Sequence, residues 1–481
     1  VDILSQKKFH MPTAYTILFL LLILVAAATW IIPAGSYDYV DGVPVAGTYH
    51  PVEQNPQGVG DVLKAAFSGF YDAVDVCIFI LMVGGFLGVV MKTGAVDAGV
   101  ANIIRLLGGR EKWLIPILML LFGLGGTTYG MWEETMAFYP LLIPVFLAAG
   151  YDAVVGISVI LLGAGAGVIA STVNPFATGI AAGFAGVSLG EGIVLRLLEW
   201  VAFEAAAIWF VMAYAAKVKK NPSKSVVGVG AGKIQVSMDQ QVPFTAKRKV
   251  IMALFTLTFL IMVYAVVPFD EMGLSLPALG WWFPELSALF LVAGVVIGLI
   301  DRMSEEELVE IYVAGCADLL GVAFIIGISR GITVLMNDGA ITDTVLHWGE
   351  QALSGAGAIS FTLLVFALYL PLTILIPSSS GLATLSIPIV APLGKFAGVG
   401  GDLVVTAFQS ASGLVNIITP TAAVVMGALA LGHVPYDRWV KYVWKLILWF
   451  LLLALAFLVE AYDEEQLDEK DTRVVMHLHP A

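Results

Sequence analysis

A pair of adjacent carboxylates, Glu133 and Glu134, lies between two short apolar runs of the chain. Ionisable residues at membrane depth are rare and usually mark the path of an ion, a proton or a substrate. Two neighbouring carboxylates could hold a cationic group of a substrate or exchange a proton. The apolar flanks favour this interpretation over the alternative, in which both side chains are solvated at the membrane surface.

Small hydroxyl and amide side chains gather in four short clusters that interrupt apolar stretches. Each offers a hydrogen bond to a substrate, and oxygens at the tips of such segments could also bind Na+. For any one residue the alternative is a bond to its own helix or a role in helix packing. Because the clusters occur together, we expect one binding site formed by Thr127, Thr128, Ser171, Thr172, Asn174, Thr178, Ser378, Ser379, Ser380, Thr384, Asn416, Thr419 and Thr421.

Two further charged residues are candidates for this site. Arg330 is the only basic residue well inside an apolar run. Its guanidinium could pair with a substrate carboxylate, and a structural bond to a buried acid or a hairpin carbonyl is the alternative. Asp318 stands at nearly the place in the second half of the chain that Asp72 has in the first, and either function or helix capping explains it. No nucleophile–base pair or set of metal ligands occurs at membrane depth, so we expect neither an intramembrane enzyme nor a cofactor other than a coupling ion, H+ or Na+.

The composition places these residues in a polytopic membrane protein. Of 481 residues, 59% are hydrophobic and 13% are charged, whereas soluble domains average about 45–50% and 25%. An ordinary soluble protein, a disordered chain and a nucleic-acid-binding protein are thereby excluded. The run 14–34 is longer than the roughly 7–15 apolar residues of a secretion signal, so we interpret it as a first transmembrane helix.

Two pairs of short apolar stretches flank polar tips and predict re-entrant hairpins at 113–149 and 357–396. Lipid cannot satisfy the open backbone of such tips, but two half-helices that meet inside the protein can. Two further apolar stretches contain Pro175 and Pro420, and each proline removes a helical donor. We predict that both of these helices unwind in the middle of the membrane.

The same features recur at a nearly constant interval, so that Pro140 matches Pro388 and Pro175 matches Pro420. Two copies of one transporter-like module explain this recurrence. The expected all-α organisation is a tail with a first helix (1–34), an external segment (35–71), repeat 1 (72–216), a basic cytoplasmic linker (217–249), repeat 2 (250–459) and an acidic tail (460–481).

The distribution of positive charge predicts the orientation. If each hairpin enters and leaves on one side, the chain crosses the membrane nine times. Lys and Arg concentrate in 217–249 and also occur in the N-terminal tail, and cytoplasmic segments carry such an excess. We expect a cytoplasmic N-terminus, an external C-terminus and inverted repeats in the plasma (inner) membrane. The binding site of inverted repeats lies near the midplane, where half-helix ends attract charged groups.

Four stretches carry a resemblance to a known family: 130–135 (GMWEET), 138–144 (FYPLLIP), 171–175 (STVNP) and 376–381 (IPSSSG). Over residues 10–460 the chain resembles the anaerobic C4-dicarboxylate carrier family of the ion transporter superfamily, and in particular its basic amino-acid antiporter-like branch. The resemblance implies a homodimeric elevator, with a scaffold domain and a moving transport domain that holds both hairpins. Relatives in the divalent anion symporter branch carry Ser-Asn-Thr at both tips, and this sequence carries it at neither.

Secondary active transport of a small amino or organic acid is the function that these observations favour. Acids outnumber bases near the apolar runs, so Glu133 or Glu134 would meet a cationic substrate while Arg330 or a helix N-terminus holds its carboxylate. We therefore prefer exchange or ion-coupled uptake of an arginine- or ornithine-type substrate. The alternatives are a carrier of C4-dicarboxylates or other carboxylates coupled to H+ or Na+, and a passive channel or exchanger.

Overall fold

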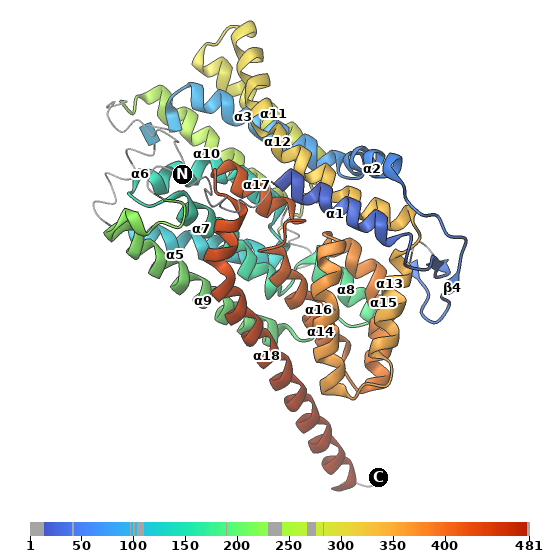
Figure 1. Ribbon diagram of the computed structural model, residues 1–481. Helices are drawn as coiled ribbons and strands as arrows, with labels where there is room; N and C mark the ends of the chain where they lie inside the picture. Colours follow the sequence, from blue (N-terminus) through green and yellow to red (C-terminus); the bar gives the residue numbers. More distant parts are fainter. Residues whose placement is uncertain are drawn as a thin grey trace, which may run out of the picture.

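The computed structural model describes residues 14–40, 43–96, 98–99, 102, 110–188, 190–228, 243–266, 276–281 and 283–478. Figure 1 shows a body of packed helices from which the C-terminal part of the last helix projects. The first half of the chain contains α1 (Ala14–Ala28), α2 (Val59–Asp72), α3 (Val74–Lys92), η1 (Glu111–Trp113), α5 (Leu114–Tyr129), η2 (Glu133–Ala137), α6 (Tyr139–Ala148), α7 (Ala153–Ile169), the π-helix η3 (Pro175–Gly179), α8 (Ile180–Ala185), α9 (Ile193–Lys220) and η4 (Pro222–Lys224). The second half contains α10 (Ala246–Val266), α11 (Phe283–Asp301), α12 (Glu305–Asp338), α13 (Thr342–Leu353), α14 (Ala358–Leu375), α15 (Ser379–Ala397), α16 (Gly401–Asn416), α17 (Ala423–Leu431) and α18 (Tyr436–Leu478).

Six of the described helices are long and apolar enough to cross a bilayer: α3, α11, α12, α14, α15 and the part Tyr436–Ala461 of α18. Large apolar side chains such as Leu121 on α5 and Trp209 on α9 are exposed on the surface of the body. Exposed apolar surface of this kind suits contact with lipid. The helical, membrane-spanning class predicted from composition is therefore confirmed.

Two short antiparallel β-ribbons lie between α1 and α2, where the sequence predicted only helices and an external segment. They pair β1 (Gly35–Ser36) with β4 (His50–Pro51), and β2 (Tyr39–Val40) with β3 (Val43–Pro44). The ribbons are held by α13, because Asp343 accepts hydrogen bonds from the Tyr37 backbone N–H at 3.0 Å and from the Tyr39 hydroxyl at 2.7 Å. The expectation of an all-α chain needs this small correction.

A long antiparallel contact joins α2 and α3 to α12, which has 34 residues. A Cβ on Gly69 of α2 would lie 2.1 Å from the Gly327 carbonyl oxygen, and one on Gly84 of α3 would lie 2.5 Å from the Gly315 carbonyl oxygen. Small residues allow helix backbones in membranes to approach this closely. The helix α2 falls in a segment where the sequence analysis expected no helix.

Both predicted hairpins are pairs of helices that meet at a polar tip. In the first, α5 and α6 flank the tip that contains η2, and in the second α14 and α15 flank a tip at 376–378. Both predicted breaks are also present. Helix α7 ends at Ile169 before the π-helix η3, and α16 ends at Asn416 before α17 begins at Ala423.

The two broken helices form the buried centre of the molecule. All 17 residues of α7 are buried, and so are 15 of the 16 residues of α16. A Cβ on Gly413 would lie 2.6 Å from the Ile169 Cα, so α7 and α16 are in contact beside both breaks. The polar residues at the breaks of α7 and α16 therefore lie in the interior of the protein.

Two predicted segments are covered only in part. Residues 229–242 of the expected basic linker, and 97, 100–101 and 103–109 before the first hairpin, lie outside the described residues. Helix α18 runs on to Leu478, so the acidic tail that begins at 460 continues the last helix.

Candidate functional site

A polar cavity of about 210 Å³ lies where the two hairpin tips meet the two helix breaks. Nine residues nominated from the sequence line it: Glu133, Glu134, Asn174, Arg330, Ser378, Ser379, Ser380, Asn416 and Thr421. They come from four separate stretches of the chain and from α12. The structure thus brings together members of three of the four predicted hydroxyl and amide clusters, whereas Thr127 and Thr128, which form the cluster at the first tip, do not line the cavity.

The first tip is shaped by Gly130 and Asn174. Gly130 ends α5 in the left-handed conformation, with φ of 77°. A Cβ at this position would lie 2.6 Å from both the Oδ1 and the Nδ2 of Asn174. Only glycine fits this combination of backbone and contact, which seats the tip on the first break and places the Asn174 side chain at the cavity.

The two glutamates follow in the 3-10 helix η2. Glu134 is 6% exposed, and its Oε2 accepts a hydrogen bond from the Trp132 backbone N–H at 3.2 Å. Glu133 also lines the cavity. Both carboxylates therefore lie at the cavity, with Glu134 buried and Glu133 partly exposed.

The second tip begins a helix at the cavity. Ser378 caps α15, because its hydroxyl oxygen accepts a hydrogen bond from the Gly381 N–H at 3.2 Å. Helix α17 also begins at the cavity wall, where Ala422 and Ala423 lie. Helix N-termini carry partial positive charge and attract anionic groups, so two such ends face this cavity.

Charged side chains of both signs complete the lining. Arg330 of α12 lies with its Nε 3.9 Å from the Asp72 Oδ2, and Asp75 at the start of α3 also lines the cavity. Together with Glu133 and Glu134, the cavity has four acids and one guanidinium. An occupant with a carboxylate and a net positive charge would satisfy this arrangement.

The acids Asp72 and Asp75 were not among the nominated site residues. Both stand beside apolar runs, so the reasoning that selected Glu133 would also have selected them. Ser329 is another residue that the sequence did not single out. Its hydroxyl donates to the Thr421 carbonyl oxygen and so ties α12 to the second break.

Several nominated residues hold the chain together and do not line the cavity. The Thr127 hydroxyl donates to the Ala170 carbonyl oxygen at 2.7 Å, and the Thr172 N–H donates to the Thr127 carbonyl oxygen at 2.9 Å. These bonds fasten the first hairpin to the first break. Hydroxyls of Thr128 and Thr384 donate to carbonyls one turn earlier in their own helices, at 2.6 and 2.9 Å.

The remaining nominated hydroxyls lie buried at the two breaks. The Thr178 hydroxyl donates to the Ser171 carbonyl oxygen at 3.4 Å, and the hydroxyls of Thr419 and Thr421 lie 2.9 Å apart. The Ser171 hydroxyl has no hydrogen-bond partner within the described part of the chain. Of this group only Thr421 reaches the cavity.

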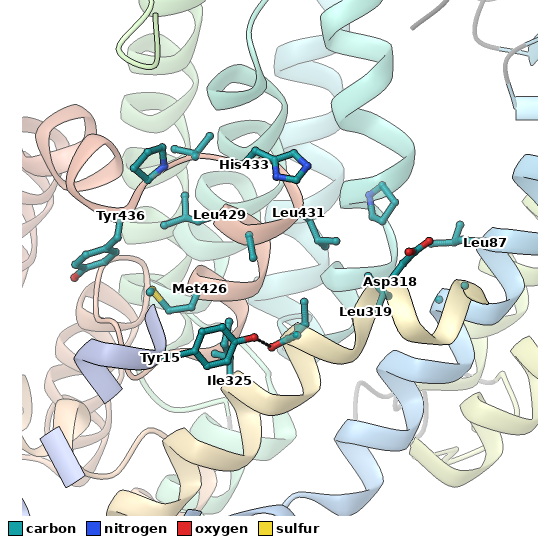
Figure 2. Close-up of a pocket in the computed structure, with 18 of the residues that line it drawn as sticks. Tyr15, Leu87, Asp318, Leu319, Ile325, Met426, Leu429, Leu431, His433 and Tyr436 are labelled. Carbon is teal, nitrogen blue, oxygen red and sulfur yellow. Dashed lines mark hydrogen bonds between the residues drawn. The ribbon is translucent and has the colours of Figure 1, made fainter. Parts of the chain in front are cut away.

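Asp318 lies in a second, larger cavity of about 840 Å³ between α3, α12, α17 and the start of α18. Figure 2 shows Tyr15 reaching the backbone of α12 in this cavity, where its hydroxyl donates to the Gly321 carbonyl oxygen at 2.7 Å. A Cβ on Gly427 of α17 would lie 2.5 Å from the Met136 Cε and 2.9 Å from the Val322 Cγ1. Close apolar contacts therefore join α17 to η2 and to α12, where Val322 lines this larger cavity.

A metal site made of acidic, histidine or cysteine ligands does not appear in the described ranges. No group of three or more such side chains is placed there to hold an ion. The oxygen ligands available at the tips are the carboxylates of Glu133 and Glu134 together with hydroxyl, amide and backbone groups.

A polytopic helical protein whose hairpin tips and helix breaks surround a charged cavity belongs to the membrane transporters. This chain belongs to the C4-dicarboxylate anaerobic carrier family, DcuC, whose model matches residues 11–463. The family membership that the four sequence stretches indicated is confirmed, and so is the general function of membrane transport.

Two relatives match nearly the whole chain. An "Uncharacterized protein" of Haemophilus influenzae is 35% identical over 495 residues, which cover 92% of this chain and 95% of the relative. The "Putative basic amino acid antiporter YfcC" of Escherichia coli is 30% identical over 484 residues, which cover 90% of this chain and 93% of the relative.

Two solved structures show a more distant likeness. The YdaH transporter of Alcanivorax borkumensis has 15% identity and a TM-score of 0.43, over 93% of this chain and 98% of that chain. MtrF of Neisseria gonorrhoeae, described with a class of antimetabolite efflux pumps, has 16% identity and a TM-score of 0.43, over 93% and 94% of the two chains.

Proposed function

We propose that this protein is a secondary active transporter of a small amino acid, which binds in the cavity between the hairpin tips and the helix breaks. The proposal is carried by the charges of that cavity, where Arg330 and two helix N-termini accompany four carboxylates. A basic amino acid of the arginine or ornithine type brings one carboxylate and two cationic groups, which these partners match. The name of the Escherichia coli relative agrees with this substrate class.

The size of the cavity supports a small metabolite. Pockets for drug-sized ligands measure roughly 300–1,000 Å³, and this cavity measures about 210 Å³. Its position beside the broken ends of α7 and α16 is where carriers built on inverted repeats bind their substrates.

A C4-dicarboxylate is the second candidate, and specific features favour it. The family is described by that substrate class, and the N-termini of α15 and α17 together with Arg330 could hold two carboxylates. Four acids in the same cavity would then need protons or Na+ to neutralise them. Na+ would bind to oxygens at the hairpin tips.

The contact between the first helices of the two halves supports inverted repeats. Gly69 and Gly315 are separated by 246 residues, as are Gly85 and Gly331. A Cβ on Gly69 would lie 2.5 Å from the Gly331 nitrogen, and a Cβ on Gly315 would lie 3.1 Å from the Gly85 Cα. If each residue is replaced by its counterpart in the other half, the contact of Gly69 with Gly331 becomes the contact of Gly315 with Gly85. Because the helices are antiparallel, this exchange corresponds to a two-fold axis between inverted repeats.

The same relation suggests where repeat 1 begins. Helices α2 and α3 together cover 59–92, which equals the length of α12, at 305–338. In this scheme α2, α3 and α12 belong to the scaffold, whereas the hairpins and broken helices move as the transport domain of a homodimeric elevator. The second cavity lies along α12 and α17, beside the scaffold helix α12 of this scheme.

The expected topology forms part of this proposal: nine crossings, a cytoplasmic N-terminus and an external C-terminus in the inner membrane. Its support is the Lys and Arg excess of 217–249 and the position of the hairpin tips. Both tips share a cavity with the breaks of α7 and α16, and this arrangement agrees with tips that lie inside the membrane.

Uptake by the purified protein in proteoliposomes tests the function. We expect saturable uptake of labelled arginine or ornithine, competed by unlabelled basic amino acids and driven above the external concentration by a counter-substrate or an ion gradient. Competition by succinate alone would establish the dicarboxylate alternative. Uptake that neither saturates nor accumulates would identify a passive channel.

A further inference from the structure

Glu204 of α9 is a buried carboxyl away from the cavity. Its residue is 2% exposed, and neither carboxyl oxygen has a hydrogen-bond partner within the described ranges of the chain. It does not line the substrate cavity. A buried polar group without a partner is rare in folded proteins and calls for an explanation.

The carboxyl occupies a notch in the first hairpin. A Cβ on Gly123 of α5 would lie 2.3 Å from the Glu204 Oε2 and 3.2 Å from the Gly163 carbonyl oxygen. The missing side chain of Gly123 therefore makes the space in which the carboxyl sits, next to the backbones of α5 and α7. An ionised oxygen there would face a carbonyl oxygen, which is an acceptor and repels it.

Among the described residues, no opposite charge faces this carboxyl from α5, α7, α18 and η4, which pack against α9, or from α16, which reaches α9 through Ser410. Helices α5 and α7 contain no charged residue. Helix α18 meets this region with Phe450, whose ring lies 5.0 Å from that of Phe203. Within Tyr436–Ala461 its bases lie near its start, at 438, 441 and 445, and η4 carries the exposed Lys224.

The nearest ionisable residues on α9 itself have other neighbours. Glu199 is fully buried, and its Oε2 accepts a hydrogen bond from Ser410 of α16 at 3.5 Å. Arg196 lies one turn before it and donates to the Glu191 carbonyl oxygen at 2.7 Å. Asp402 of α16 lies beside the start of α9, where its Oδ2 would be 3.0 Å from a Cβ on Gly192. None of these residues shares the Gly123 notch, where an unpaired carboxylate would be costly.

We infer that Glu204 is a proton-binding site that couples proton movement to transport. In the arrangement described here the carboxyl holds its proton and sits neutral in the Gly123 notch. Loss of the proton would leave an unpaired negative charge between α5, α7 and α9, and these helices would have to separate to let water reach it. Protonation therefore favours the packed position of the first hairpin.

The helix α5 connects this site to the substrate cavity. One turn after Gly123, Thr127 is bonded to the first break, and the helix ends at Gly130 against Asn174. A movement of α5 away from α9 would therefore shift a residue that lines the cavity. This inference rests on the proposed transport function and assigns the coupling ion to a proton bound outside the substrate cavity.

The test is a comparison of Glu204→Gln with wild type in proteoliposomes that contain a pH-sensitive dye. Gln has the shape of the neutral acid but cannot release a proton. We expect E204Q to exchange substrate across membranes without a pH gradient within about twofold of wild type, while substrate-driven proton flux and stimulation by a pH gradient are lost. Glu199→Gln is the matched control on the same helix, and it should keep proton coupling.

Coupling in E204Q equal to wild type, or loss of coupling in E199Q alone, would overturn the inference. Wild-type transport with no proton flux would also overturn it, while leaving the proposed function intact. Failure of the wild type to transport any amino or dicarboxylic acid would instead contradict the proposed function. If E204Q does not insert, Glu204→Met, which is also neutral and of similar volume, answers the same question with the same outcomes.

Discussion

The substitution Gly130→Ala tests how the first tip forms the cavity. Gly130 has a φ of 77°, a conformation that costs an L-residue about 1–2 kcal/mol. The added Cβ would also lie 2.6 Å from two atoms of the Asn174 side chain, closer than side-chain atoms pack. The tip can accept the methyl group only if Asn174 moves away from its position at the cavity.

The expected effect follows from the bond that Asn174 would lose. A substrate group left without its buried partner costs about 1–3 kcal/mol, and each 1.4 kcal/mol corresponds to about tenfold in affinity. We therefore predict that G130A inserts normally but transports with a KM raised about tenfold or more. The strain in the backbone should also lower the unfolding temperature of the purified protein.

Gly183→Ala provides the matched control. Gly183 lies in α8 with an ordinary φ, and a Cβ there would meet nothing within 4 Å. This variant should keep the wild-type KM and unfolding temperature, because alanine is at least as favourable as glycine inside a helix. A KM for G130A within twofold of wild type would refute the role of Gly130 and Asn174 in shaping the site.

Three other predictions address the site and the topology. Glu133→Gln and Glu134→Gln should each abolish or shift exchange of cationic amino acids, measured as counterflow; unchanged exchange in both would remove the carboxylates from the site. Alanine at Asn174 or Ser379 should weaken apparent affinity by about tenfold or more, and wild-type affinity in both variants would show that tip and break are structural. A cysteine at Glu465 should react with an impermeant thiol reagent in intact spheroplasts; reaction only after lysis would contradict the external C-terminus.

The hairpins and breaks could be predicted from sequence because the residues that interrupt each helix are visible within the apolar run itself. Proline and the polar tips interrupt apolar runs, and a membrane allows such interruptions only inside protein. Helix α2 was missed because Asp61, Lys64 and Asp72 make its sequence look like an external segment. Its buried residues Val62, Ala65, Ala66 and Gly69 have helical spacing, which was the available signal.

The sequence could not predict which hydroxyl residues line the cavity and which ones bond to the protein's own backbone. Thr127 and Ser379 are equally good donors by type, yet Thr127 bonds to the Ala170 carbonyl whereas Ser379 lines the cavity. That difference arises from contacts between distant stretches of the chain. The carboxyl of Glu204 is a similar case, because its isolation depends on the notch at Gly123 of another helix.

The most direct test of the central claim is ligand-dependent thermal stability of the purified protein. A ligand at 100 times its Kd stabilises the folded state by about 2.7 kcal/mol, which is enough to raise the unfolding temperature measurably. We predict that arginine or ornithine stabilises the wild type and that Glu133→Gln removes most of this effect. Stabilisation by succinate but not by arginine would contradict the basic amino acid assignment. It would indicate that Glu133 and Glu134 bind a coupling ion.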